Sequence, residues 1–235
     1  GIRDHRGGGR ASARETAGRV AAGAVAKKLL DLHGITVTAY TVALGGITTA
    51  KRHLNEITDN PLFCPDNEAA AQMISHIETV RAEGDTLGGI VEILATGCPA
   101  GLGEPVFEKL DAALAGALMS IGAVKGVEIG AGFGAAAMRG SENNDVILPE
   151  GFASNNSGGI LAGISNGDAI VARVAVKPIP SISREQQTIN LAREPVAVSI
   201  GGRHDISAIP RIIPVCEAMV ALTLADHLLR HKAIA

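Results

Sequence analysis

The sequence contains very few aromatic residues, and this scarcity argues against some functions at once. Its 235 residues include no tryptophan, one tyrosine and four phenylalanines. Proteins that bind single-stranded nucleic acid stack the bases on aromatic side chains. The formal net charge of −3 also provides no general attraction for phosphate backbones. We therefore expect no nucleic-acid partner.

Cysteines and long apolar runs are scarce as well. Cys64, Cys98 and Cys216 are widely spaced and odd in number, which favours reduced thiols over a disulfide framework or a zinc site. No unbroken apolar run approaches the length that a bilayer requires. The polar, glycine-rich beginning of the sequence does not have the pattern of a signal peptide. These features predict a cytoplasmic protein with no metal site and no membrane partner.

Small residues, in contrast, are abundant. There are 29 glycines, and hydrophobic residues make up 46% of the chain. A core of small aliphatic side chains lets backbones approach closely, and glycine-rich segments can present many backbone N–H groups to a ligand. The length suits one substantial domain. Residues 35–100 and 106–176 show no convincing internal repeat, so we expect a single domain over residues 1–235.

The hydrophobic pattern predicts helices and strands in alternation. Helices are expected at residues 12–33, 67–83, 106–121 and 206–232, and strands at 35–44, 87–96 and 124–129. Two further strands, 157–164 and 170–176, are expected to form a hairpin that turns at Asn166-Gly167. Residues 177–202 are expected to form a loop. This order favours an α+β sandwich over a doubly wound parallel sheet.

The first candidate site is the stretch GIRDHRGGGRASARE at residues 1–15. Three glycines precede a helix start, where Ser12 and Glu15 have the spacing of a capping box. A helix N-terminus after flexible backbone attracts anions. Four guanidinium groups that can bind phosphate or carboxylate at two points surround it: Arg3, Arg6, Arg10 and Arg14. We interpret the stretch as an anion site. A flexible basic loop would be the simpler interpretation of the glycines alone.

Two later segments also carry chemical groups. In GGRHD at residues 201–205, Arg203 could bind an anionic substrate and Asp205 could act as a base. Equally, Asp205 could cap the helix that begins nearby. Residues 177–181, KPIPS, offer one cation and one hydroxyl on a rigid backbone, although alone they fit an ordinary proline-bounded turn. The glycine-rich stretch at 158–163 suggests close approach by a ligand or another strand.

Several motifs together resemble the chorismate synthase family. In order, they are GIRDHRGGGRASARETAGRVAAGAVAKKLL, DNPLFCPD, ATGCPAGLGEPVFEKLDAALAGALMSIGAVKGVEIG, SNNSGGILAGISNG and GGRHD, and they cover essentially the whole chain. The resemblance implies a homotetramer of β-α-β sandwich subunits. It also implies a lyase that converts 5-enolpyruvylshikimate 3-phosphate to chorismate by 1,4-anti elimination of phosphate with reduced FMN. Whether a partner flavin reductase or an intrinsic NAD(P)H activity reduces the flavin stays open.

The resemblance also assigns roles to residues. It implies FMN contacts for Arg10, Ala11, Ser12, Gly122, Ala123, Ala162, Lys177, Pro178, Ile179, Pro180, Ser181 and Arg203. It places Ser12, Arg14 and Arg203 near the substrate. Asp205 matches the family aspartate proposed to act at the flavin N5 during proton transfer. Ala11 stands where many members have Ser, and Gly122 where many have Asn, so a hydrogen bond to the flavin is expected to be lost.

By the same resemblance, the chain corresponds to the C-terminal portion of the family. The family's N-terminal part carries two catalytic histidines and several substrate-binding arginines, and neither His5 nor His204 matches those histidines. We therefore expect the 235-residue chain alone to bind FMN weakly and to show no turnover. Two alternatives remain: a non-catalytic oligomerising fragment with incomplete ligand sites, and a general phosphate- or nucleotide-binding module.

Overall fold

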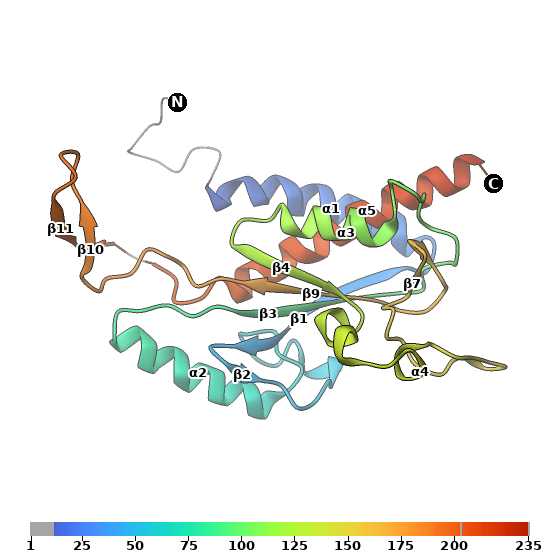
Figure 1. Ribbon diagram of the computed structural model, residues 1–235, viewed down its shortest axis with the longest axis horizontal. Coiled ribbons are helices and arrows are strands. Elements are labelled where there is room, and N and C mark those ends of the chain that lie inside the picture. Colours follow the sequence, from blue (N-terminus) through green and yellow to red (C-terminus); the bar gives the residue numbers. More distant parts are fainter. Residues whose placement is uncertain (1–11, 203, 235) are drawn as a thin grey trace. The chain divides into compact units, whose positions relative to one another are not determined.

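The computed structural model describes residues 12–202 and 204–234 (Figure 1). The chain divides into two compact units. Unit 1 comprises Gly1–Ala39, Glu92–Val174 and Ile212–Ala235, and unit 2 comprises Tyr40–Val91 and Ala175–Arg211. Several helices and strands continue from one unit into the other. The expectation of a single domain stays a prediction.

The largest sheet has five strands in the order β2-β1-β3-β9-β4. Their bounds are Thr36–Leu44 for β1, Ile47–Thr48 for β2, Gly89–Thr96 for β3, Val124–Ile129 for β4 and Ile170–Val176 for β9. The turn between β1 and β2 uses Gly45 and Gly46, with φ of +58° and +85°, as a two-residue hairpin turn requires. Together with the helices, this sheet confirms the predicted α+β class.

In unit 1, helices α1 (Thr16–Asp31) and α5 (Ile209–Ile234) pack at very short range (Figure 1). Glycine makes this possible, because a Cβ added at Gly23 would lie 2.3 Å from the Cβ of Ala218. Glu217, next to that contact, accepts a hydrogen bond from the Ala39 N–H of β1 at 2.8 Å and pairs with Lys27. The small-residue composition therefore serves close packing of helix on helix.

Helix α5 is also long and apolar. Among the described residues it is the one helix whose length and composition would suit a membrane span, and 61% of its most apolar window is buried within the protein. The sequence alone does not predict such a segment. Core helices pass the same test, and the packing of Ala218 against Gly23 fits a core role.

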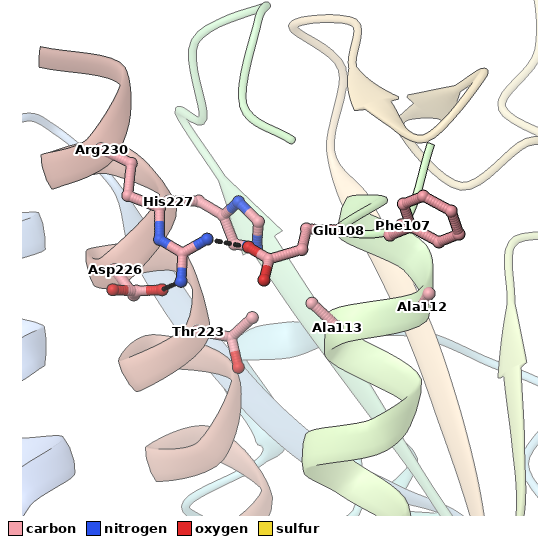
Figure 2. Close-up of a pocket in the computed structure, with 8 residues that line it drawn as sticks. All are labelled: Phe107, Glu108, Ala112, Ala113, Thr223, Asp226, His227 and Arg230. Carbon is pink, nitrogen blue, oxygen red and sulfur yellow. Dashed lines mark hydrogen bonds and ion pairs between the residues drawn. The ribbon is translucent and has the colours of Figure 1, made fainter. Parts of the chain in front are cut away.

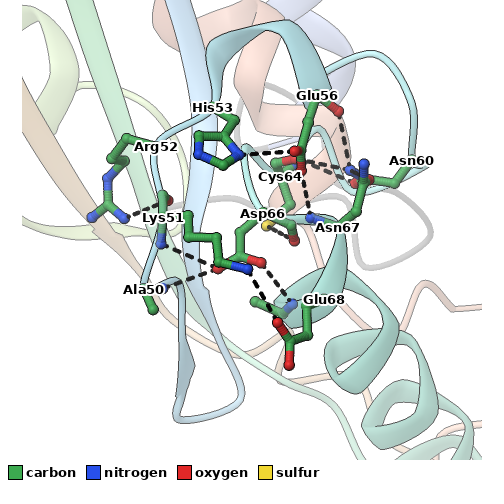
Figure 3. Close-up of polar contacts among 11 residues, drawn as sticks. Ala50, Lys51, Arg52, His53, Glu56, Asn60, Cys64, Asp66, Asn67 and Glu68 are labelled. Atoms are coloured by element: carbon green, nitrogen blue, oxygen red, sulfur yellow. Dashed lines mark hydrogen bonds and ion pairs between the residues drawn. The ribbon is translucent and has the colours of Figure 1, made fainter.

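Unit 2 contains α2 (Asn67–Ala82), which begins at a dense polar turn (Figure 3). Asp66 is 3% exposed and caps the helix by accepting the Ala69 N–H at 3.1 Å. Its other oxygen accepts the N–H groups of Ala50 and Lys51 at 3.1 and 3.2 Å. These hydrogen bonds, that from Ala69 foremost, hold the pKa of Asp66 below its usual value. The start of α2 is therefore tied to the end of the β1–β2 hairpin.

Three predictions about elements differ from the structure. The helix predicted at 106–121 is α3, which begins only at Leu110 and ends at Met119. Glu104 and Glu108 instead exchange backbone hydrogen bonds of 2.9 and 3.0 Å in an antiparallel bridge. This bridge occupies the residues that the first helical turn would need.

The hairpin predicted at Asn166-Gly167 is also wrong. The short strands β7 (Ile160–Leu161) and β8 (Ile164–Ser165) pair with each other instead. Gly158 and Gly159 have φ of +64° and +77°, a backbone conformation that interrupts an extended strand. The predicted strand at 157–164 is therefore reduced to one side of a small turn.

The remaining elements are short. Helix α4 (Gly140–Asn143) and the β5–β6 hairpin (Ile147–Leu148, Gly151–Phe152) lie between β4 and β7 in the chain. The predicted loop at 177–202 contains a hairpin of β10 (Gln186–Ile189) and β11 (Pro195–Val198). The prediction of a plain loop there is wrong. The two strands read QQTI and PVAV and are mostly exposed, so neither shows the alternation of apolar and polar residues that marks a half-buried strand.

Candidate functional site

The first predicted site group in unit 1 lies at the start of α1. Ser12 caps a short 3-10 helix, Ala13–Glu15, and its Oγ accepts the Arg14 N–H at 3.4 Å. The predicted cap at Ser12 is thus confirmed. The capping box is not formed, because the Glu15 carboxylate pairs with Arg19 Nε at 2.8 Å instead. The predicted residues Arg3, Arg6, Arg10, Ala11 and Arg203 lie outside the described residues.

The loop between α3 and β4 carries two further predicted FMN contacts. Ala123 has a φ of +72°, and a Cβ added at Gly122 would meet no atom within 4 Å. Arg19 reaches this loop from α1, donating from Nη1 to Ser120 Oγ at 2.6 Å and from Nη2 to Ser120 O at 3.3 Å. Arg19 therefore joins the first turn of α1 to the loop that holds Gly122 and Ala123.

Ala162 lies at the turn between β7 and β8, where it is exposed and has a φ of +53°. Ser165 holds this hairpin in place, since its Oγ donates to Pro99 O at 2.6 Å and accepts the Leu102 N–H at 2.9 Å. Left-handed backbone at a residue other than glycine costs on the order of 1–3 kcal/mol and is concentrated at functional sites. Ala123 and Ala162 both show it, as do Phe63 and Arg193, and the role of the two alanines stays a prediction.

In unit 2, the two remaining predicted segments, 177–181 and the one around Asp205, both hydrogen-bond to the short loop at residues 86–87. Thr86 Oγ donates to Ile179 O at 2.7 Å, and the neighbouring Leu87 N–H donates to Ile206 O at 2.7 Å. The segment at 177–181 is thus hydrogen-bonded to Thr86, and Ile206, the residue after Asp205, is hydrogen-bonded to the next residue, Leu87. Close packing reinforces this, because a Cβ at Gly88 would lie 2.5 Å from Val176 O. The structure therefore brings these two predicted segments together.

Asp205 is paired with a cation. Its carboxylate, 49% exposed, accepts from Arg211 at both oxygens: Oδ2 from Nε at 2.8 Å and Oδ1 from Nη2 at 3.1 Å. The alternative role of capping the last helix falls to Ser207, whose Oγ accepts the Ile209 N–H at 3.3 Å. Asp205 is therefore left as an oriented, solvent-accessible carboxylate.

The three cysteines contribute no nucleophile. All are free and buried. Burial raises the pKa of Cys98 to about 11 and that of Cys216 to about 12. Both thiols are therefore protonated near neutral pH and poor nucleophiles. The reduced state of the three thiols stays a prediction.

Two cavities lie in unit 1 apart from the predicted residues. One, of about 380 Å³, opens between α3 and α5 (Figure 2). Arg230 on its wall pairs with Glu108 and, at 3.0 Å, with Asp226. The other, of about 340 Å³, includes Arg173, which pairs with Glu128 at 3.2 Å. Neither of these two cavities is lined by a predicted site residue.

Sequence reasoning missed three residues that contact the predicted site segments: Arg19, Thr86 and Arg211. The four-residue spacing of Glu15 and Arg19 could have indicated their ion pair. No local pattern marks the partners of Thr86 and Arg211. No local pattern marks Ser120 as a partner of Arg19 either.

A family profile described as chorismate synthase matches residues 1–229. The chain belongs to the chorismate synthase family. It is 67% identical over 229 residues to the chorismate synthase of Syntrophobacter fumaroxidans, covering 97% of this chain and 65% of that protein. It is 66% identical over 234 residues to that of Desulfosudis oleivorans, covering 100% of this chain and 66% of the relative.

A solved crystal structure of a chorismate synthase has the same fold. The two chains superpose with a TM-score of 0.79 at 36% identity, over 94% of this chain and 65% of the other. The predicted chorismate-synthase-like sandwich is thereby confirmed. The chain spans a little under two thirds of the length of the chorismate synthases it matches. The roles of individual site residues remain predictions.

Proposed function

We propose that the protein takes part in the chorismate synthase reaction. This reaction converts 5-enolpyruvylshikimate 3-phosphate to chorismate at the last common step of aromatic amino acid biosynthesis. The observation that carries the proposal is the clustering of the assigned residues within each unit. The start of α1 is joined to residues 120–123 through Arg19, and residues 177–181 are joined to the Asp205 segment through Thr86 and Leu87.

The described residues fit FMN as the cofactor. The space beside Gly122 is open, and the backbone at Ala123 and Ala162 is left-handed. Lys177 is exposed and Ser181 half-buried, so an ammonium and a hydroxyl are available to the phosphate of the flavin. Reduced FMN would supply electron density to the substrate, with no net redox change.

The elimination breaks the C–O bond to phosphate and one ring C–H bond, and the chain provides groups for both events. Arg14 is exposed at the start of α1, where its guanidinium would bind an anionic group of the substrate. Asp205 would accept and pass on the proton through a carboxylate oxygen. Its two-point pair with Arg211 keeps that carboxylate oriented.

Family membership supports the finer proposals about the assembled enzyme. We propose a homotetramer in the cytoplasm. We also propose that its flavin is reduced with NADPH, either by a partner flavin reductase or within the protein itself. The free, buried cysteines are compatible with a reducing compartment.

Ligand binding tests the proposal first, and turnover second. FMN and 5-enolpyruvylshikimate 3-phosphate are titrated into the wild-type chain and into Asp205→Asn, and chorismate is then assayed anaerobically with chemically reduced FMN. We expect both ligands to bind, with affinities within about twofold in the variant. Because the chain alone is expected to show no turnover, the effect on rate is measured with the same substitution in a longer, active parent chain, where activity should fall by roughly 10²–10⁴, the range for a lost acid–base group. Failure of the wild-type chain to bind either ligand would overturn the proposal.

A further inference from the structure

Arg19 is a half-buried residue to which the family resemblance assigns no role, yet its guanidinium contacts three elements. Nε donates to Glu15 before α1, and both Nη atoms donate to Ser120 after α3. Nη1 also lies 3.6 Å from the Met219 sulfur on α5. The side chain is 24% exposed. One planar group thus links segments that are 101 residues apart in sequence.

The chemistry of this contact requires arginine. A guanidinium presents donors in a rigid fork, so one edge can bind a carboxylate while the opposite side binds a hydroxyl and a carbonyl. A lysine ammonium is a point charge and cannot reach both partners in the same geometry. Because Glu15 already offsets the charge of Arg19, this guanidinium is suited to position protein segments rather than to bind an anionic ligand.

The two segments that Arg19 joins are those assigned to substrate and flavin. Arg14 directly precedes Glu15, and Ala123 follows Ser120 by three residues. Ala123 is held at a φ of +72°, a conformation that persists only where surrounding contacts enforce it. Loss of the hydrogen bonds at Ser120 would free this loop to relax. The loop would then lose its fixed place beside the start of α1.

We propose that Arg19 is a positioning residue, which fixes residues 120–123 against the first turn of α1 and so pre-organises the flavin-binding loop beside Arg14. This inference rests on the proposed function. Its expected consequence is weaker FMN binding, because a loop that must be ordered on binding lowers affinity. Removal of the guanidinium should raise the FMN Kd about tenfold or more.

The test compares FMN affinity with thermal stability in matched variants. Arg19→Met, Arg19→Lys and Ser120→Ala are compared with Arg81→Met, because Arg81 pairs with Glu78 on the exposed face of α2 and touches no predicted site residue. We expect Arg19→Met to raise the FMN Kd at least tenfold, and Arg19→Lys to raise it nearly as much. Ser120→Ala should raise the Kd a few-fold. Arg81→Met should leave the Kd within twofold.

A double variant separates positioning from general destabilisation. If Arg19 acts through Ser120, the Kd of Arg19→Met with Ser120→Ala should stay within about twofold of that of Arg19→Met alone. An Arg19→Met protein with a lowered Tm but an unchanged Kd, measured well below that Tm, overturns the inference while FMN binding by wild type stands. Absence of FMN binding by wild type overturns the proposed function, and the inference with it.

Discussion

At the scale of single residues, Gly122 offers a direct test of the flavin site. The family resemblance implies Asn at this position in many members, and here a Cβ would meet no atom within 4 Å, at a backbone conformation open to any residue. We expect the free energy of unfolding of Gly122→Asn to stay within about 0.5 kcal/mol of the wild-type value. One added hydrogen bond should tighten FMN binding roughly 2–10-fold.

Isothermal titration of FMN and thermal melting measure these two effects separately. Gly132→Asn serves as the contrast, because Gly132 has a φ of +56° and a Cβ there would lie 2.6 Å from the Glu128 side chain. That variant should lose stability. An unchanged or weaker FMN affinity in Gly122→Asn would show that the space beside residue 122 does not face the flavin.

The range of each contact decides which residues the sequence could predict. Ser12 was predicted as a cap from its capping-box spacing to Glu15, and the N–H group that it accepts, that of Arg14, is only two residues away. The bond from Arg19 to Ser120 spans 101 residues and that from Thr86 to Ile179 spans 93. No local pattern specifies such partners. The motifs therefore indicated which residues matter, and folding was needed to show what holds them in place.

At the scale of elements, two glycines in α1 should respond in opposite ways to the same substitution. Gly23 packs against Ala218 of α5, where a Cβ would lie 2.3 Å from the side chain and 2.5 Å from the backbone Cα. Gly18, on the same helix, has open space around it. We expect Gly23→Ala to cost about 1–2 kcal/mol, since overpacking outweighs the gain in helix propensity.

Gly18→Ala should instead raise the free energy of unfolding by about 0.5–1 kcal/mol, because alanine restricts the unfolded chain and favours helix. Urea unfolding followed by circular dichroism measures both changes. Equal effects of the two substitutions would mean that α1 and α5 do not touch at Gly23.

The cap of α2 gives a prediction about pH. Asp66 accepts Ala69 N–H at one oxygen and the N–H groups of Ala50 and Lys51 at the other. In Asp66→Asn, the side-chain NH₂ group would point at backbone N–H donors on one side of the cap. The variant should therefore lose about 1–3 kcal/mol of the free energy of unfolding near pH 7. Asp59→Asn, at an exposed carboxyl nearby, should have little effect.

The sign of the pH dependence follows from the lowered pKa of Asp66. A carboxyl group whose pKa is lower in the folded than in the unfolded state stabilises the fold. This stabilisation is fully present above the pKa of the unfolded state, which is near 4. That contribution is lost as the pH falls through the folded pKa. The stability difference between wild type and Asp66→Asn should therefore shrink below about pH 4. A difference that stays constant down to pH 2 would contradict the assignment.

Elements were predictable where local pattern and final structure agree. Strand β4 was predicted at its observed bounds, and α2 to within one residue. The failures at 106–109 and 157–164 have specific causes. A bridge between Glu104 and Glu108 replaces a helical turn, and glycines at positive φ interrupt a strand. Each depends on backbone conformations that a hydrophobic pattern does not encode.

At the scale of the whole molecule, the open question is whether the two units unfold together. Strands β1, β3 and β9 and helix α5 each continue across the boundary between the units. Domain boundaries normally fall in exposed linkers that few contacts cross. Melting one unit would remove the ends of four elements from the other. Continuous elements therefore favour a single cooperative transition, as the single-domain prediction requires.

Calorimetry tests this with variants placed in each unit. Gly23→Ala lies in unit 1 and Asp66→Asn in unit 2. If the units unfold as one, each variant should lower the Tm of the same transition, and the calorimetric and van't Hoff enthalpies should agree. Saturating FMN should then raise that one Tm, because a ligand that binds only the folded state stabilises by about 2.7 kcal/mol at a concentration of 100 Kd. Two transitions, each lowered by only one of the variants, would establish two domains, and FMN would identify the one that binds it.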